Sequence, residues 1–291
     1  MSNSSLVSYT RLSPSHSGAR THSIDRITPH CVVGQLSVET LGGIFANSLR
    51  QASSNYGIGT DGRVALYVAE GNRSWCSSSN ANDQRAVTIE CASDLKSPYA
   101  FNDKVWDKLV LLCADICKRN GKKRLVFKGS LAKTEAYEAN GKTSDEMMLT
   151  VHRWFADTDC PGDWLMNRLD DLVKAVNKKL GVKSKITLTN YNYPKTLTKG
   201  KPFVIKGKVK STWALRKVTV VVENYNTGKD IAYATYSVKL KTAKTYSLSN
   251  IDPHISFKKL PVGTYRYKVK ATDSNGATKT LLSKKFTVKK K

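Results

Sequence analysis

Residues 149–164 read LTVHRWFADTDCPGDW, and this stretch decides how the first part of the chain is expected to fold. The apolar residues just before His152 are typical of a short strand. Pro161 suits the first turn of a helix, which places Cys160 at a helix N-terminus, where the helix dipole stabilises a thiolate. We therefore expect His152 at a strand end and Cys160 at a helix start to converge on one ion.

Zinc is the ion that these donors indicate, because it prefers imidazole nitrogen and thiolate sulfur. His152 and Cys160 are eight residues apart, a spacing that suits two ligands on either side of an irregular loop. A catalytic zinc needs a third protein ligand. The candidate is His30, in the run ITPHCVV at residues 27–33. A histidine and a cysteine at such a distance also occur by chance, so the positions relative to strand and helix carry this interpretation.

Several separated motifs resemble, in the same order, those of the type-2 zinc N-acetylmuramoyl-L-alanine amidases, a family that includes phage endolysins and peptidoglycan recognition proteins. The motifs are HRWFADTDCPG at 152–162, His30 upstream, NYGIG at 55–59 and VTIE at 87–90. The resemblance covers roughly residues 8–181. It implies a Zn²⁺ ion held by His30, His152 and Cys160.

The same resemblance implies roles for further residues. Glu90, at the end of VTIE, is expected to act as general base, and Tyr56 to help position the carbonyl or the water. The alternative for Glu90 is an ordinary glutamate at a strand end that faces solvent. The alternative for Tyr56 is an aromatic residue of the core. Thr158 stands where many members carry a lysine, and its neutral hydroxyl is a weaker oxyanion stabiliser than an ammonium. Trp75 and Asn82 stand where members line the substrate groove.

The chain has 291 residues, of which 40% are hydrophobic, so it has room for one large domain and one small domain. No apolar run approaches the ~18–20 residues that span a bilayer. Residues 1–18 have no basic segment followed by an apolar core, and we expect no secretory signal. The expected localisation is therefore the cytoplasm of the cell that makes the protein.

Six cysteines in a chain of this length do not form a disulfide scaffold, and we expect reduced thiols. Cys113 and Cys117 lie one helical turn apart and are expected in a core. Cys31 and Cys91 each adjoin a candidate site residue. Because neighbours on a strand face opposite sides, we expect both thiols to point away from the site.

The net charge of +25 is unevenly distributed. Residues 181–291 carry 25 Lys and Arg against four Asp and Glu, whereas the remainder of the chain is only +4. The field of the second part suits a polyanion, although lysines on alternate strand positions can also be a solvated face that prevents edge aggregation. A Gram-positive wall, rich in anionic teichoic acid, fits this charge. No recognised nucleic-acid fold argues for a specific nucleic acid.

The predicted fold class is α/β, a mixed sheet flanked by helices at residues 1–181, followed by a small all-β immunoglobulin-like sandwich at 182–291. Residues 1–25 are expected as an extended arm, and 129–145 as a surface excursion. The predicted strands and helices of the first domain are a strand at 27–33, a helix capped by Ser37 that reaches Leu49, a hairpin at 56–68, a strand at 86–92, a helix from Asn102 to Gly121, a strand at 124–127 and a helix from Leu165 to Gly181.

The second domain is predicted from short alternating runs separated by turn signals, about seven strands in all. LPVGTY at 260–265 and KFTV at 285–288 resemble bacterial immunoglobulin-like modules. The basic charge makes this module the expected wall-binding domain.

The resemblance thus implies a zinc hydrolase that cleaves the amide between N-acetylmuramic acid and L-alanine in peptidoglycan, an activity of the EC 3.5.1.28 type. We expect a phage or prophage endolysin that a holin releases from the host cytoplasm to the wall. Two alternatives stay open. One is a peptidoglycan-binding recognition protein without catalysis, and the other is a basic polyanion-binding protein whose first domain is a scaffold without zinc.

Overall fold

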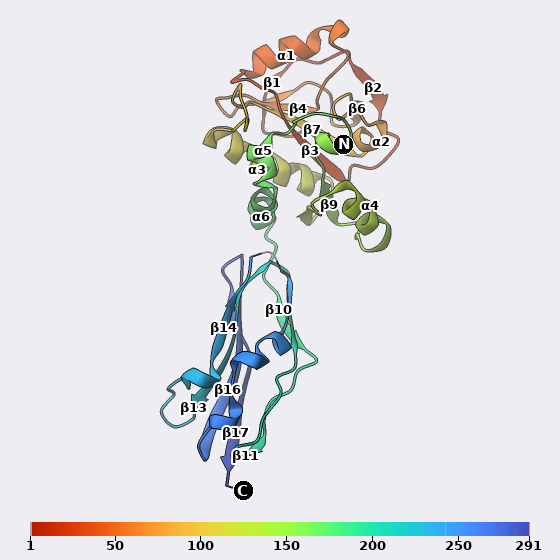
Figure 1. Ribbon diagram of the computed structural model, residues 1–291. Coiled ribbons are helices and arrows are strands. Elements are labelled where there is room, and N and C mark those ends of the chain that lie inside the picture. Colours follow the sequence, from red (N-terminus) through yellow and green to blue (C-terminus); the bar gives the residue numbers. More distant parts are fainter. Residues whose placement is uncertain (1, 242, 291) are drawn as a thin grey trace. The chain divides into compact units, whose positions relative to one another are not determined.

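The computed structural model describes residues 2–241 and 243–290. The chain divides into two compact units, Met1–Val182 and Lys183–Lys291 (Figure 1). Each unit has an apolar core of its own. In the described ranges, no helix has the length and apolar character that crossing a membrane requires.

The strands of the first unit are β1 Val7–Thr10, β2 His16–Ala19, β3 Arg26–Cys31, β4 Tyr56–Ile58, β5 Val64–Leu66, β6 Asn72–Ser74, β7 Ala86–Cys91, β8 Arg124–Val126 and β9 Glu146–Leu149. Seven of them form one sheet, in the order β1-β5-β4-β7-β3-β9-β8, while β2 and β6 pair separately. Neighbours in the large sheet are parallel, except in the β4–β5 hairpin. The predicted mixed sheet is therefore confirmed.

The helices of this unit are α1 Val38–Ala46, α2 Asn80–Asp83, α3 Asp103–Arg119, α4 Leu131–Asn140, α5 Asp163–Met166 and α6 Leu169–Lys179, with 3-10 turns η1 Ser48–Arg50 and η2 His152–Trp154. The Ser37 hydroxyl accepts a hydrogen bond from the Thr40 amide at 3.2 Å, and Asn102 caps α3 in the same way. Gly181 follows α6 with φ 73°, the left-handed conformation that favours glycine. These predicted caps are confirmed.

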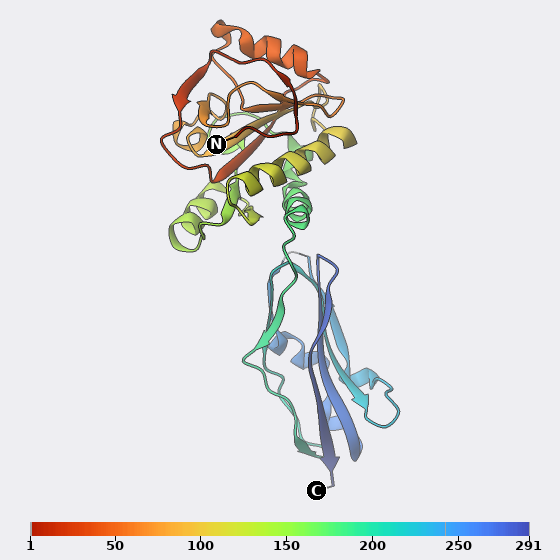
Figure 2. The same ribbon diagram turned by 180° about the vertical axis from the view of Figure 1, so that it is seen from behind.

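Helices cover both faces of the large sheet (Figures 1 and 2). The main apolar cluster joins α3 and α6 to strand residues such as Tyr56 and Ile89. A smaller cluster joins α1 to Ala65 and Tyr67. Because side chains alternate along a strand, His30 and Glu90 lie on the α1 side, opposite the main core.

The structure corrects two predicted helix boundaries and adds secondary structure to two segments for which none was predicted. The polar segment 129–145 contains α4, whose sequence LAKTEAYEAN is rich in good helix formers and is capped by Ser130. The N-terminal arm supplies β1 and β2. The long helix expected from Leu165 is two helices, and α1 ends at Ala46, which leaves Leu49 outside it and 86% exposed.

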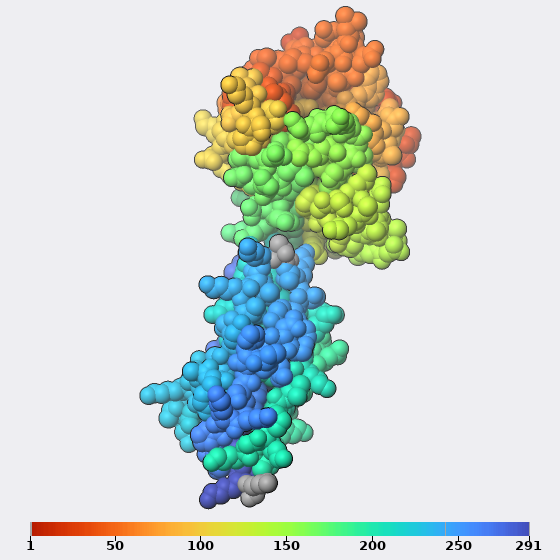
Figure 3. Space-filling model, viewed as in Figure 1, coloured from red at the N-terminus to blue at the C-terminus, as the bar shows by residue number. Residues whose placement is uncertain are grey.

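A cluster of ion pairs fastens α4, which lies at the surface (yellow-green in Figure 3), to the sheet. Glu138 of α4 contacts Arg26 of β3 at 2.6 Å and Arg85 at 2.9 Å. Asp25 contacts Arg85 at 2.6 Å and also Lys142, which follows α4. Ion pairs therefore hold α4, a helix that apolar periodicity does not predict, against the sheet.

Asp25→Asn is expected to lower the free energy of unfolding of the first unit by about 2 kcal/mol at pH 7. Burial raises the pKa of Asp25, but hydrogen bonds and charge from Arg85 and Lys142 outweigh it and lower the pKa to about 2. This stabilisation is present above the unfolded pKa of 3.8 and is lost as the pH falls toward 2. Denaturant unfolding at pH 7 and pH 2.5 checks this, since the difference between wild type and variant must shrink at the lower pH.

The second unit consists of β10 Ile186–Thr189, β11 Thr196–Thr198, β12 Lys208–Ser211, β13 Leu215–Asn224, β14 Tyr236–Lys239, β15 Thr245–Ser247, β16 Gly263–Asp273 and β17 Thr278–Lys289, with 3-10 turns η3 Ala232–Ala234, η4 Leu248–Asn250, η5 Asp252–His254 and η6 Phe257–Lys259. The sheets are β10-β12-β15 and β11-β17-β16-β13-β14. Side chains of both sheets share one core. The unit is all-β, and its relation to immunoglobulin-like modules stays a prediction.

Candidate metal centre

Three side chains with metal-binding atoms converge at one edge of the large sheet. His30 lies on β3, His152 opens η2 directly after β9, and Cys160 lies in the loop before α5. Each residue offers one donor atom, and these three atoms all lie within 4.8 Å of one another. The Cys160 Sγ is 3.4 Å from His30 Nδ1, and the two imidazole centroids are 4.9 Å apart. Parallel pairing of β3 with β9 brings the first two together.

The donors fit a zinc ion. His30 is 1% exposed, and its Nε2 has no hydrogen-bond partner within residues 2–241 and 243–290. Burial and the neighbouring His152 lower the pKa of His30 to about 3, and burial also lowers the pKa of His152. Both rings are therefore neutral at pH 7, which is the form that ligates metal. Two neutral imidazoles and a thiol match the donor preference of zinc.

Glu90 lies beside this group. On the parallel strands β3 and β7 it is the direct partner of His30, so both side chains project from the same face. Its Oε1 is 3.9 Å from Cys76 Sγ, and its buried Oε2 has no hydrogen-bond partner in the described part of the chain. Burial raises the pKa of Glu90 to about 7, although Cys76 and the charge of Arg50 act in the opposite direction.

A cavity of about 570 Å³ opens over these residues. Its volume lies within the ~300–1,000 Å³ typical of ligand sites. Trp75 and Thr158 line it, as do residues that sequence reasoning did not assign to a site, notably Arg50, Cys76 and Tyr99. No sequence motif marks those three, because they reach the cavity from separate loops.

Trp75 and Thr158 each hold a defined contact within the cavity wall. The Trp75 Nε1 donates to the Ser17 hydroxyl at 2.6 Å. The Thr158 hydroxyl accepts from the Cys160 amide at 3.2 Å. Thr158 therefore fixes the loop that carries a metal donor, in addition to facing the cavity.

Tyr56 does not reach the cavity. It is fully buried, its hydroxyl donates to Glu70 Oε2 at 2.7 Å and accepts from the Ser4 amide at 2.9 Å. On β4 it pairs with Ile89, whereas Gly57 pairs with Glu90, so Tyr56 faces the core. The position facing the site is glycine because a Cβ there would lie 2.4 Å from the Tyr67 ring.

Asn82 does not reach the cavity either. It is fully buried beneath the site, where its amide donates to Thr28 and Ser77 and accepts from Arg26 and Thr150. Its four hydrogen bonds tie α2 to β3 and to the residue after β9. In this structure Asn82 is a support of the sheet, not a groove residue.

Tyr56→Phe is expected to lower the free energy of unfolding by about 1–3 kcal/mol, because buried Glu70 and the Ser4 amide each lose a partner. The rate constant of catalysis at saturating substrate is expected to stay within about twofold of wild type. Denaturant unfolding and kinetics of the same preparation check both. A large fall in this rate constant with unchanged stability would show that Tyr56 takes part in the reaction.

Two details around Cys160 differ from expectation. Helix α5 begins at Asp163, because Gly162 has φ 82° and cannot continue a first turn from Pro161. The Cys160 thiol donates a hydrogen bond to the Cys31 sulfur, and this contact together with burial raises the pKa of the Cys160 thiol. Cys31 and its register partner Cys91 both belong to the main core cluster, and Cys31 also lines the cavity. All six cysteines are free.

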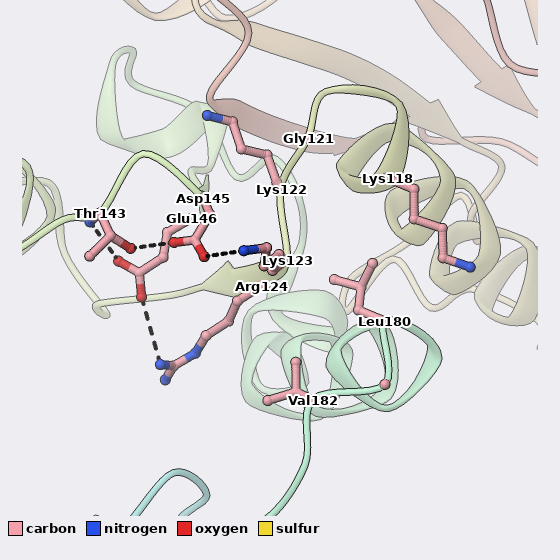
Figure 4. Close-up of a pocket in the computed structure, with 11 residues that line it drawn as sticks. Lys118, Gly121, Lys122, Lys123, Arg124, Thr143, Asp145, Glu146, Leu180 and Val182 are labelled. Atoms are coloured by element: carbon pink, nitrogen blue, oxygen red, sulfur yellow. Dashed lines mark hydrogen bonds and ion pairs between the residues drawn. The ribbon is translucent and has the colours of Figure 1, made fainter.

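A larger cavity, of about 750 Å³, lies between the C-terminal ends of α3 and α6 and the strands β8 and β9 (Figure 4). Its charged side chains largely pair with each other, Lys123 with Asp145 and Arg124 with Glu146, each at 3.6 Å. None of its lining residues belongs to the metal-binding group. The smaller cavity is therefore the candidate site.

Comparison with known proteins gives a family for the first unit. The model of the N-acetylmuramoyl-L-alanine amidase family matches residues 20–163, a range that contains the three metal-binding residues and Glu90. A comparison with curated proteins gave no match.

Several solved structures resemble the chain. A Staphylococcus aureus hydrolase, AmiA, in complex with its ligand is 14% identical, with a TM-score of 0.42 over 59% of this chain and 82% of that one. A mutant endolysin from Bacillus subtilis is 14% identical, with a TM-score of 0.37 over 60% and 99%. The endolysin amidase LysCS from Clostridium intestinale URNW is 14% identical, with 0.36 over 61% and 98%. These values are too low to carry an argument on function.

Proposed function

Because the first unit of this chain belongs to the N-acetylmuramoyl-L-alanine amidase family, we propose that it hydrolyses the amide between N-acetylmuramic acid and L-alanine in peptidoglycan. His30, His152 and Cys160 would hold the zinc ion on which this reaction depends. The observation that carries the proposal is the convergence of these three donors, within 4.8 Å of one another, in a cavity that also contains Glu90.

Zinc, when bound, supplies a Lewis acid that polarises the amide carbonyl and activates water. The neutral imidazoles of His30 and His152, together with Cys160, would hold that ion at the wall of the cavity. Glu90 takes the proton from the attacking water, at the carboxylate oxygen Oε2 that has no other partner in the described residues. It then delivers the proton to the leaving nitrogen, which amide cleavage requires.

The chain shapes the rest of the reaction through three further groups. The apolar side chains of α1, such as Leu41 and Phe45, close one wall of the cavity and exclude water. Thr158 presents a neutral hydroxyl near the metal-binding group. Arg50 adds a positive charge at the rim, where it favours an anionic substrate such as a stem peptide with free carboxylates.

Digestion of purified Gram-positive walls tests this function. New free amino groups without new reducing sugar ends are expected, and their release should stop with a chelator and in His152→Ala. The matched control is His22→Ala, an exposed histidine outside the metal-binding group. Reducing ends without amines would contradict the amidase.

A non-catalytic recognition protein is the second candidate, and the neutral Thr158 in the cavity favours it. Wall binding without amine release, by protein that retains one zinc per chain, would establish that alternative. Zinc-free protein that binds polyanions would instead indicate the scaffold alternative.

We also propose an endolysin role, in which the protein is made in the host cytoplasm and reaches the wall through a holin. The second unit would hold the enzyme at the wall by binding an anionic polymer, which raises the local substrate concentration. Its 25 Lys and Arg against four Asp and Glu in residues 181–291 support this part. Expression inside a Gram-positive host is expected to cause lysis only when a holin is also expressed.

A further inference from the structure

Four neighbouring strands of the five-stranded sheet in the second unit, in the order β17-β16-β13-β14, carry basic side chains on their outer face (strands labelled in Figure 1). Along β16, residues alternate between core and surface, and every surface position from 266 to 270 is basic. We call the following six side chains the basic face: Lys217, Lys239, Arg266, Lys268, Lys270 and Lys285.

Two pairs of cations lie directly opposite each other on this face. Lys217 of β13 is the register partner of Lys239 of β14, and Arg266 of β16 is the partner of Lys285 of β17. Like charges in such positions destabilise a sheet. A polyanion laid across the strands would remove this repulsion, so the arrangement favours a bound anion over a merely solvated surface.

Carboxylates neutralise only one end of the basic face. Glu223 contacts Arg266 at 3.1 Å and Lys268 at 2.6 Å, and the backbone of Asp230 pairs with that of Glu223. Among the described residues, no carboxylate lies within salt-bridge distance of the other four cations, and of these four Lys285 lies over the Tyr225 ring. Lys217, Lys239 and Lys270 are therefore the basic-face cations that contact neither a carboxylate nor an aromatic ring in the described residues.

Hydroxyl groups fill the positions between those lysines. Thr219 faces Ser237 at 2.8 Å, and Thr272 faces Thr278 at 2.8 Å, so both pairs lie on the outer side of the sheet. Lysine ammonium groups and hydroxyls are the donors that phosphate oxygens accept from. These donors repeat every ~4.8 Å from strand to strand and every ~6.7 Å along a strand, where every second residue faces outward.

We propose that the basic face binds a linear polyol-phosphate chain of the cell wall, with Lys217, Lys239 and Lys270 as its main phosphate contacts. This inference rests on the proposed wall-binding function and names the surface that performs it. The chain lies across β14, β13 and β16, and each of the three lysines contacts a phosphodiester.

A nucleic acid fits this surface less well. Sequence-independent binding of single strands uses aromatic platforms on which bases stack. The aromatic side chain at the basic face is Tyr225, and its ring is already covered by Arg266 and Lys285, with centroid distances of 4.7 Å and 4.5 Å. The three uncompensated lysines are interleaved with threonine and serine instead.

The test uses the full chain with Glu90→Gln, so that walls are not digested during binding. Lys217→Gln/Lys239→Gln/Lys270→Gln is compared with Lys206→Gln/Lys208→Gln/Lys210→Gln, which removes the same charge from exposed positions on and before β12 of the other sheet. The probes are soluble poly(glycerol phosphate), walls before and after extraction of their phosphate polymer, and single-stranded DNA of equal charge.

The basic-face variant is expected to bind poly(glycerol phosphate) about 100-fold more weakly at low salt. Its plot of log K against log salt should become shallower by about 2, because three phosphate contacts are lost. The control variant should stay within about threefold of the parent. Melting temperature reports folding, and the variant should melt no lower than the parent, since the Lys217–Lys239 repulsion is removed.

Three outcomes would overturn the proposal. These are equal losses in both triple variants, undiminished binding to extracted walls, or tighter binding to DNA than to poly(glycerol phosphate). The amidase is judged separately, by amine release from extracted walls with Glu90 intact. Wild type and basic-face variant should release amines there at equal rates, and an absence of release would contradict the amidase while leaving the binding result interpretable.

Discussion

Glu90→Gln is expected to lower the rate of amide hydrolysis by about 10²–10⁴-fold while zinc content stays at one ion per chain. The glutamine keeps the size and polarity of the side chain but cannot accept the proton of the attacking water. Zinc analysis and amine release from walls, measured on one preparation, check this. A variant that keeps more than a tenth of the activity would show that Glu90 is not the base.

A measurement of the free energy of unfolding distinguishes loss of the catalytic base from loss of the folded structure. Burial raises the pKa of Glu90 to about 7, so in the metal-free protein the ionised carboxylate costs stability above its unfolded pKa of 4.5. At pH 8 the metal-free Glu90→Gln variant is therefore expected to be at least as stable as wild type. Glu135→Gln, an exposed carboxylate on α4, is the matched control and should change neither property.

Cys160→Ala is expected to abolish both zinc retention and activity. The thiol is one of three protein donors, and the two histidines alone fall one short of the three protein ligands that a catalytic zinc needs. Dialysis against a weak chelator, followed by metal analysis, is expected to give about one zinc per wild-type chain and almost none for the variant.

Cys113→Ala is the matched control for that experiment. This thiol is fully buried in the main core, on α3 and away from the metal-binding group. Its removal should cost stability, because a buried atom is lost, and should leave zinc content unchanged. If Cys160→Ala keeps its zinc, or if both variants lose it, the assignment of Cys160 as a ligand is wrong.

Periodicity and capping residues determined much of the fold. Ser37 and Asn102 start their helices and Gly181 ends one because each satisfies local backbone groups, and local chemistry is visible in the sequence. Helix α4 was missed although its composition favours a helix, since it has little apolar periodicity and is held by ion pairs of Glu138 with Arg26 and Arg85.

The candidate site was recognisable from motifs only in part. His30, His152 and Cys160 carry chemistry that is rare enough to stand out, and Glu90 ends a distinctive strand. Arg50 and Cys76 carry no such signal, because each is brought to the cavity by packing of its loop.

By itself, the sequence determined the donor types, the mixed α/β pattern and the division of charge between the two parts of the chain. Only the tertiary structure decided which side chains share a face. Register places Gly57, and not Tyr56, opposite Glu90, and it places Lys217 opposite Lys239. The physical reason is that a shift of one residue reverses the face of a strand, and register is set by pairing between segments far apart in the chain.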